Sequence, residues 1–250
     1  NITASDLETT LKAKMAIENV TEEGEITIPA KLLTDSLREF ADQPLEFKTN
    51  ESNSIIEILW ATGNAKLPCT LSDDYPSIPD LSEENTTITI NSRTLLEGIN
   101  RTLYATAEEE LRPVMNGIYF DIDTDSTTLV ASDAHKLVCY TRHDIKSETK
   151  SAFILPKKPS SVLKNILGKG DEEVIVKFDK RNAYFEFESF VLVCRLVEGN
   201  YPAYRSVIPK NNTNKLVINR TDFLNSARRV AVCSNQASSQ VRLKLSYNTL

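Results

Sequence analysis

The chain has 250 residues, of which 40% are hydrophobic and 26% are charged, and its formal net charge is −6. This length and apolar content allow a sizeable buried core and about two domains. The sequence contains no apolar run near the ~20 residues that a membrane-spanning helix needs, and no signal segment at its start. We therefore expect a cytoplasmic protein that does not act on membranes.

The four cysteines lack the short paired spacings of a metal site. They are Cys69, Cys139, Cys194 and Cys233. Buried free thiols in a reducing compartment are expected, with a disulfide or metal framework as the alternative. Carboxylates are abundant but do not form a recognisable ligand set, so neither a metal nor a cofactor is predicted.

The first predicted helix covers residues 29–40 and begins at Pro29. At the helical spacing of 100° per residue its basic residues, Lys31 and Arg38, point outward. The face expected to pack on a sheet consists of Leu32, Leu33, Leu37 and Phe40. A strand is predicted next, over residues 54–60.

The second predicted helix covers residues 91–104 and exposes Arg101. Its expected buried face consists of Leu95, Leu96, Ile99 and Leu103. Residues 116–122 and 128–132 follow it as two apolar strands. Because an Asp/Thr/Ser turn separates them, they are predicted to pair as a hairpin.

The third predicted helix covers residues 156–169, and the alternating residues 183–188 after it predict a strand. The fourth covers residues 219–230. Their expected buried faces consist of Val162, Leu163, Ile166 and Leu167, and of Phe223, Leu224, Ala227 and Val230. Their basic residues expected to face outward are Lys157, Lys164 and Arg229.

These helices start at nearly constant spacing, at residues 29, 91, 156 and 219. The sequence at the start of the first helix resembles that of the third, and the sequence at the start of the second resembles that of the fourth. Pro29 corresponds to Pro156, and Asn91 corresponds to Asn219. The sequence therefore repeats a unit of about 127 residues, which is itself made of two βαβββ halves. The predicted class is α+β, with helices on one face and antiparallel sheets on the other.

Two proline-containing loops, at residues 74–79 and 200–209, separate the repeats and predict domain boundaries. The expected domains are residues 1–83, 84–212 and 213–250. Only the second is a full unit, so the chain is expected to be a segment of a longer parent that lacks both ends.

Charge is unevenly distributed between the helices and the remainder of the chain. The four helical segments hold eleven Lys or Arg and four Asp or Glu, a net of +7 in a chain of net −6. A localised basic surface of this kind suits phosphate contacts that do not read base sequence.

The only cluster with residue types of a hydrolase is Ser132, Asp133 and His135. Neighbours on one turn rarely align a nucleophile, a base and an orienting acid. A hydrolase using these three residues therefore stays an alternative, as does a repeat scaffold that does not bind nucleic acid. His135 could equally be a structural turn residue, and Tyr201-Pro202 a rigid linker.

Residues 112–118 (RPVMNGI) and 129–137 (LVASDAHKL) resemble the middle domain of the bacterial replicative sliding clamp, the beta subunit of DNA polymerase III. Residues 201–209 (YPAYRSVIP) are similar to that family's junction between its middle and last domains. The resemblance extends over essentially the whole chain. It implies a non-catalytic homodimeric ring of three-domain subunits, with helices lining a hole that encircles duplex DNA. The residues that would face the DNA are Lys31, Arg38, Arg101, Lys157, Lys158, Lys164, Arg228 and Arg229.

In that family a hydrophobic peptide of the partner protein docks between the second and third domains. The implied partners are the polymerase III catalytic subunit, the clamp loader and other proteins with the clamp-binding motif. The matching pocket positions are Met115, Ser132, Ala134, His135, Lys136, Leu137, Pro202, Ser206 and Val207. The chain departs from the family's usual Gly at Ala134 and from its usual Arg at Lys136 and Ser206.

Overall fold

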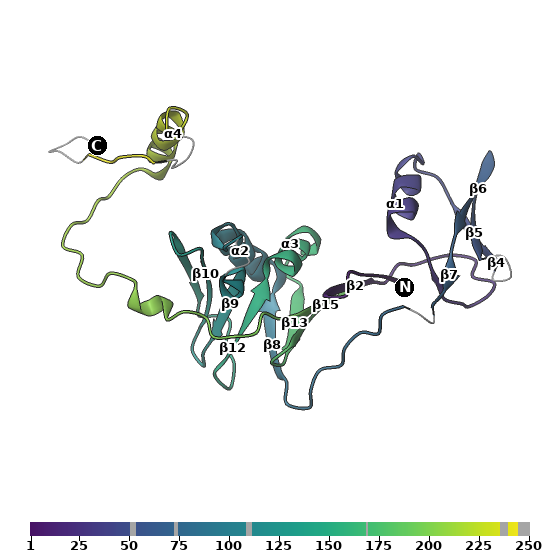
Figure 1. The fold of residues 1–250 in the computed structure, drawn as a ribbon, viewed down its shortest axis with the longest axis horizontal. Helices are drawn as coiled ribbons and strands as arrows, with labels where there is room; N and C mark the ends of the chain where they lie inside the picture. Colours follow the sequence, from purple (N-terminus) through teal and green to yellow (C-terminus); the bar gives the residue numbers. More distant parts are fainter. Residues whose placement is uncertain (51–53, 73–74, 109–111, 169, 236–239, 245–250) are drawn as a thin grey trace. The chain divides into compact units, whose positions relative to one another are not determined.

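The computed structural model describes residues 1–50, 54–72, 75–108, 112–168, 170–235 and 240–244. Residues 1–202 and residues 203–250 form two compact units. The class is α+β with antiparallel sheets, in agreement with the sequence (Figure 1).

All four predicted helices are present: α1 (Ala30–Arg38), α2 (Ser92–Thr102), α3 (Lys157–Ile166) and α4 (Arg220–Ala231). Their N-caps alternate as the sequence repeat predicts. The Asn91 side chain accepts hydrogen bonds from the first-turn backbone amides of α2, and Asn219 does the same for α4. Pro29 and Pro156 precede α1 and α3 without a side-chain cap. The Asn caps satisfy amides that a helix start leaves free, whereas proline pre-sets the backbone angle.

Two sheets of residues 1–202 carry the main core. The four-stranded sheet has the order β11-β10-β9-β12, and the six-stranded sheet has the order β1-β2-β15-β14-β13-β8, all antiparallel. The strands of the first are β9 (Gly117–Ile122), β10 (Thr127–Ser132), β11 (Leu137–Arg142) and β12 (Ser151–Pro156). Those of the second are β1 (Ile2–Ser5), β2 (Thr9–Ala13), β8 (Thr86–Asn91), β13 (Glu173–Phe178), β14 (Asn182–Phe187) and β15 (Phe190–Arg195). The hairpin predicted between residues 116 and 132 is the β9–β10 pair.

The two half-units exchange strands. The order β8-α2-β9-β10-β11 repeats as β12-α3-β13-β14-β15, which confirms the predicted βαβββ halves. Strand β8 of the first half pairs with β13 of the second, and β12 of the second half pairs with β9 of the first. Each sheet therefore takes three strands from one half and one from the other, and the six-stranded sheet adds β1 and β2 from the start of the chain. Neither half can complete a sheet alone.

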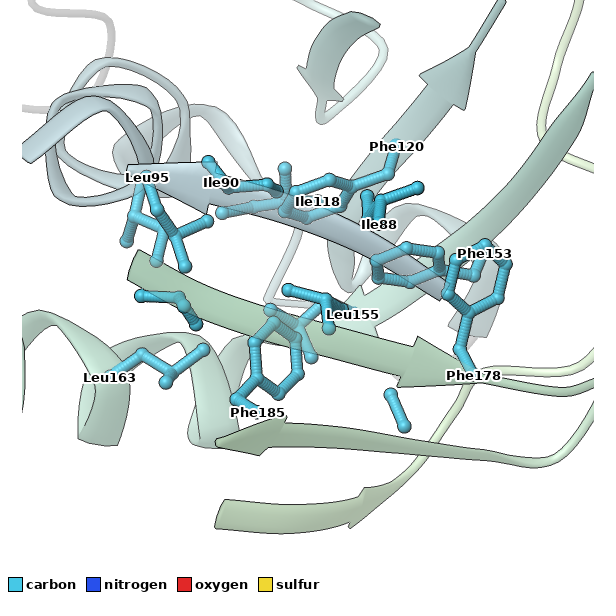
Figure 2. Close-up of a cluster of buried hydrophobic side chains, with 14 of the residues drawn as sticks. Ile88, Ile90, Leu95, Ile118, Phe120, Phe153, Leu155, Leu163, Phe178 and Phe185 are labelled. Carbon is cyan, nitrogen blue, oxygen red and sulfur yellow. The ribbon is translucent and has the colours of Figure 1, made fainter. Parts of the chain in front are cut away.

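Helices α2 and α3 lie next to each other and pack on the sheets (Figure 1). Their apolar faces enter one core, in which Leu95, Ile99 and Leu163 are at most 1% exposed. Strand residues of both sheets fill the remainder, including the stacked rings of Phe120 and Phe153 (Figure 2). The predicted inward faces of these two helices are confirmed, with Leu96, Leu103, Val162 and Ile166 only partly buried at the edge.

Residues 14–80 contain a smaller core. Strands β4 (Glu46–Asn50), β5 (Ile55–Trp60) and β6 (Gly63–Pro68) form one sheet, and β3 (Ile26–Thr27) pairs with β7 (Thr70–Leu71). Four buried residues make up the core: Ile56, Ile58, Leu67 and Cys69. Helix α1 covers this core with Leu33, while Leu32 is 40% exposed. The expectation that Leu32 is buried was wrong, because this core is too small to cover the whole apolar face.

The second unit contains a 3₁₀ turn (Tyr204–Ser206) and α4. No strand occurs among the described residues of this unit, so α4 has no sheet within it to cover its apolar face. Leu224 and Val230 are accordingly 38% and 53% exposed, contrary to the expectation that they face inward.

All four cysteines are free, but only two of them are buried. Cys69 and Cys194 lie in the two cores, whereas Cys139 on β11 and Cys233 after α4 are exposed. The expectation of buried thiols was therefore wrong for Cys139 and Cys233. Burial raises the pKa of the Cys194 thiol to about 12, so this thiol stays protonated and unreactive at neutral pH.

Candidate functional site

The basic residues of α2 and α3 form what we call the basic helix surface, defined as Arg101, Lys157, Lys158 and Lys164. Arg101, Lys158 and Lys164 are exposed, and Lys157 is half-buried at the start of α3. They lie on the sides of the helices that do not enter the core, as the sequence predicts. Within the described part of the chain, Lys164 has no carboxylate within ion-pair distance.

Carboxylates neutralise much of this surface. Lys157 Nζ lies 2.8 Å from Glu108 Oε1, and Lys158 forms an ion pair with Asp6. The hydrogen bond from Lys157 lowers the pKa of Glu108, so the partner of Lys157 is an anion at neutral pH. Neither ion-pair partner is predicted from the sequence, because Glu108 and Asp6 lie 49 and 152 residues away along the chain.

Arg101 is held by two groups. Its guanidinium donates to Glu97 Oε1 at 2.5 and 2.9 Å and lies 5.2 Å from the centre of the Tyr140 ring. The hydrogen bond from Arg101 lowers the pKa of Glu97. A cation over an aromatic face is an attractive contact, so Arg101 also fastens α2 to strand β11.

The predicted basic residues of the other two helices are also exposed. On α1, Arg38 lies 3.6 Å from Asp35, and Lys31 is also exposed. On α4, Arg229 donates to Ser226 Oγ at 3.0 Å, and Arg228 is exposed. Each predicted basic residue is therefore at the surface of its own helix.

Residues 132–136 form a tight turn between β10 and β11, which we call the Asp133 turn. Asp133 Oδ1 accepts hydrogen bonds from the backbone amides of His135 and Lys136, at 3.0 and 2.9 Å. The Lys136 ammonium bonds the other carboxylate oxygen, and together these donors hold the pKa of Asp133 well below its usual range. Ala134 sits at φ 73°, in the left-handed region. The family's usual glycine adopts this conformation without steric cost.

The Asp133 turn does not assemble a hydrolase triad. The Ser132 hydroxyl donates to the backbone oxygen of Lys136 at 2.8 Å and accepts from the Ala134 amide at 3.1 Å. The Asp133 carboxylate binds Lys136 and backbone amides, and the His135 side chain is exposed. Nucleophile, base and orienting acid are thus not joined by hydrogen bonds, as that mechanism requires.

Three other predicted pocket positions, Met115, Leu137 and Pro202, belong to residues 1–202. Met115 is buried at 8% exposure, and Leu137, the first residue of β11, is half-buried. Pro202 is exposed and follows Tyr201, whose ring stacks on Tyr119 with centroids 4.7 Å apart. Burial raises the pKa of Tyr201 to about 12.

In the second unit, Ser206 Oγ donates to the Ala203 backbone oxygen at 2.7 Å, and Val207 is 68% exposed. Both residues are therefore at the surface of that unit.

A cavity of about 510 Å³ lies next to Tyr119 and Tyr201, and it contains none of the predicted pocket residues. The turn 179–181 and residues 196–200 form most of its wall. None of the helices in the described residues is long and apolar enough to span a bilayer. Among those residues, no three His, Cys, Asp or Glu side chains gather as a metal site would require.

Repeated βαβββ halves, two antiparallel sheets and paired basic helices define a DNA-clamp fold. The family model of the central domain of the DNA polymerase III beta subunit matches residues 89–203, and that of its N-terminal domain matches residues 1–79. Together they match more than three quarters of the chain, which belongs to the DNA polymerase III beta subunit family.

Relatives and solved structures agree with this assignment. The chain is 25% identical to the beta sliding clamp of Synechococcus elongatus over 250 residues, covering 98% of this chain and 66% of that protein. It is 29% identical to the beta sliding clamp of Haemophilus influenzae over 252 residues, covering 100% of this chain and 68% of that protein. A DnaN sliding clamp from Pseudomonas aeruginosa bound to griselimycin has a TM-score of 0.88 at 25% identity, covering 95% of this chain and 64% of that chain. This chain thus spans about two thirds of the length of the relatives it matches.

Proposed function

We propose that this chain acts in DNA replication as part of a sliding clamp, a non-catalytic processivity factor that encircles duplex DNA. The observation that carries the proposal is the pair of basic helices α2 and α3 in a chain of the beta subunit family. Lysine and arginine contacts to phosphates position a protein on DNA without reading its sequence. Lys31, Arg38, Arg228 and Arg229 would extend this lining from α1 and α4.

The proposed organisation follows from the repeat: residues 1–83 belong to the first clamp domain, 84–212 are the middle domain, and 213–250 begin the third. A full ring would be a homodimer of three-domain subunits in the cytoplasm. Six copies of one domain fold around a hole would present helices to DNA, with sheets outside. The shared strand pairing of β2 with β15 supports this arrangement, because it continues one sheet across a predicted domain boundary.

The proposed partners are the polymerase III catalytic subunit, the clamp loader and other proteins that carry a hydrophobic clamp-binding peptide. The Asp133 turn, Met115 and Leu137 would contribute to the peptide pocket from the middle domain. Pro202, Ser206 and Val207 would contribute to it from the junction. Half-buried Leu137 and exposed Val207 offer the apolar surface that such a peptide needs.

A charge reversal on the basic helix surface tests the DNA contact. Lys164→Glu changes an exposed residue that has no ion-pair partner in the described residues, and Lys12→Glu is the matched control. Lys12 is exposed on β2 beside Leu11, which packs toward the core, so Lys12 points to the opposite face of the sheet. Binding to a fluorescent duplex is measured by anisotropy at several salt concentrations.

We expect Lys164→Glu to weaken binding and to make the slope of log affinity against log salt shallower by about one. Lys12→Glu should leave the slope unchanged. Equal effects of the two variants would refute the proposed DNA-facing surface. Salt-independent binding of the unmodified chain would favour the scaffold alternative.

A further inference from the structure

The ion pair between Lys157 and Glu108 joins the start of α3 to the segment that follows α2. Its Nζ–Oε1 distance is 2.8 Å, and the side chains of Lys157 and Glu108 are 37% and 85% exposed. The Lys136 charge of the Asp133 turn also lowers the pKa of Glu108, which places this carboxylate within the field of both basic groups. An anion therefore occupies the position where a lysine of the basic helix surface would receive a DNA phosphate.

We propose that Glu108 competes with DNA phosphates for Lys157 and so weakens the grip of the chain on DNA. This inference rests on the proposed function, because it requires that the basic helix surface faces duplex DNA. A carboxylate and a phosphate oxygen accept the same charge-assisted hydrogen bonds from an ammonium group. The carboxylate of Glu108 neutralises the charge of Lys157 and repels a phosphate brought close to it, so DNA gains the full contact only by displacing Glu108.

The ion pair between Lys157 and Glu108 can break and re-form at a low cost in free energy. Exposed ion pairs contribute little to stability, since water screens them and both side chains lose freedom when they pair. Glu108 can therefore leave Lys157 without unfolding α3, and it can return when the phosphate moves away. A contact that forms and breaks at low cost suits a protein that must move along DNA rather than stay at one site.

The size of the effect follows from counterion release. Each phosphate that a cation neutralises contributes about 0.9 to the salt slope on duplex DNA. Between about 50 and 200 mM salt, one such contact changes the affinity by about 3.5-fold. Releasing Lys157 from Glu108 should therefore steepen the slope by about 0.9 and raise the affinity at low salt several-fold.

Glu108 is the better residue to change than Glu97. Glu97 holds Arg101 over the Tyr140 ring, so its removal would disturb the packing of α2 on β11 as well as the charge. Glu108 has no such role in the described contacts, in which its carboxylate binds Lys157 alone. A matched control is Glu186, which lies 3.0 Å from Lys177. Both residues alternate with buried core residues of β13 and β14, so that pair lies on the sheet face away from the core.

The test compares Glu108→Gln and Glu186→Gln with the unmodified chain in the duplex-binding assay, after thermal unfolding has shown that all three are folded. The double variant Glu108→Gln/Lys157→Gln completes a double-mutant cycle with Lys157→Gln. We expect Glu108→Gln to bind several-fold more tightly with a steeper salt slope, and Glu186→Gln to match the unmodified chain. In the Lys157→Gln background the gain from Glu108→Gln should vanish.

Three results would overturn the inference. If Glu108→Gln has the same affinity and slope as Glu186→Gln, Glu108 does not compete with DNA, although the proposed function stands. If its gain persists without Lys157, the carboxylate acts only by general repulsion. If neither the unmodified chain nor Glu108→Gln binds duplex DNA with a salt-dependent affinity, this inference and the proposed function both fail.

Discussion

Replacing Ala134 by glycine should stabilise the protein. Ala134 has φ 73°, and an L-residue with a Cβ in the left-handed region costs about 1–2 kcal/mol. Glycine removes this cost but gives the unfolded chain more freedom, which costs about 0.4–1 kcal/mol. The middle of these two ranges gives a net gain of about 0.5–1 kcal/mol.

Four hydrogen bonds keep the turn in place whichever residue occupies position 134. Ser132 and Asp133 supply all of the side-chain oxygens in these bonds. The backbone therefore has no cheap way to relieve the strain by moving to another conformation. For a cooperative unit of about 200 residues the gain corresponds to a rise in Tm of about 1–4 °C.

Urea unfolding followed by circular dichroism measures the effect, with the free energy of unfolding taken from midpoint and slope. Ala152→Gly is the control, since Ala152 is an exposed strand residue of β12. Glycine there should destabilise by about 0.5–1 kcal/mol. Opposite signs at the two positions would support the reasoning. A loss of stability in Ala134→Gly comparable to that in Ala152→Gly would refute it.

Two further predictions concern helix packing and pH. A Cβ at Gly98 would lie 2.7 Å from Leu129 Cδ2 in the core, so Gly98→Ala should lose about 1 kcal/mol net despite its gain of about 1 kcal/mol in helix propensity. In a Leu129→Ala background the same change should become stabilising. Urea unfolding of the unmodified chain, the two single variants and the double variant measures both effects, and a Gly98→Ala change that destabilises both backgrounds equally would contradict the prediction. The depressed pKa of Asp133 means that its ionised form stabilises the fold above the unfolded pKa of about 3.9, and that this contribution is lost as the pH falls below it. The difference in unfolding free energy between the unmodified chain and Asp133→Asn should therefore shrink from pH 6 to pH 3; a pH-independent difference would contradict the assignment.

The sequence predicts the repeated architecture well because its signals are local. Asn91 and Asn219 are side-chain caps, Pro29 and Pro156 mark the alternate helix starts, and the apolar periodicity identifies the buried faces of α2 and α3. Burial on α1 and α4 could not be predicted in the same way. It depends on how much sheet surrounds each helix, and a helical period reports only which residues share a face.

The basic helix surface was likewise predicted from the sequence only in part. The outward direction of Lys164 follows from helical geometry alone. The ion pairs of Lys157 with Glu108 and of Lys158 with Asp6 depend on tertiary contacts between distant segments, so counting charges by helix overestimated the free positive charge. Tyr119 was missed as the partner of Tyr201, although its alternation with buried Ile118 and Phe120 indicates a side chain on the other face of β9.

The pairing of strands that lie far apart in the chain has a consequence for synthesis on the ribosome. Strand β2 pairs with β15, where Thr9 lies opposite Cys194, so its partner is made 185 residues later. At about 5–20 residues per second, β2 waits about 10–40 s for that partner. Strand β8 likewise waits for β13. The nascent chain therefore carries unpaired strand edges for a long interval, and it depends on the polar side chains of β2, such as Lys12, to stay apart from other chains until the sheet closes.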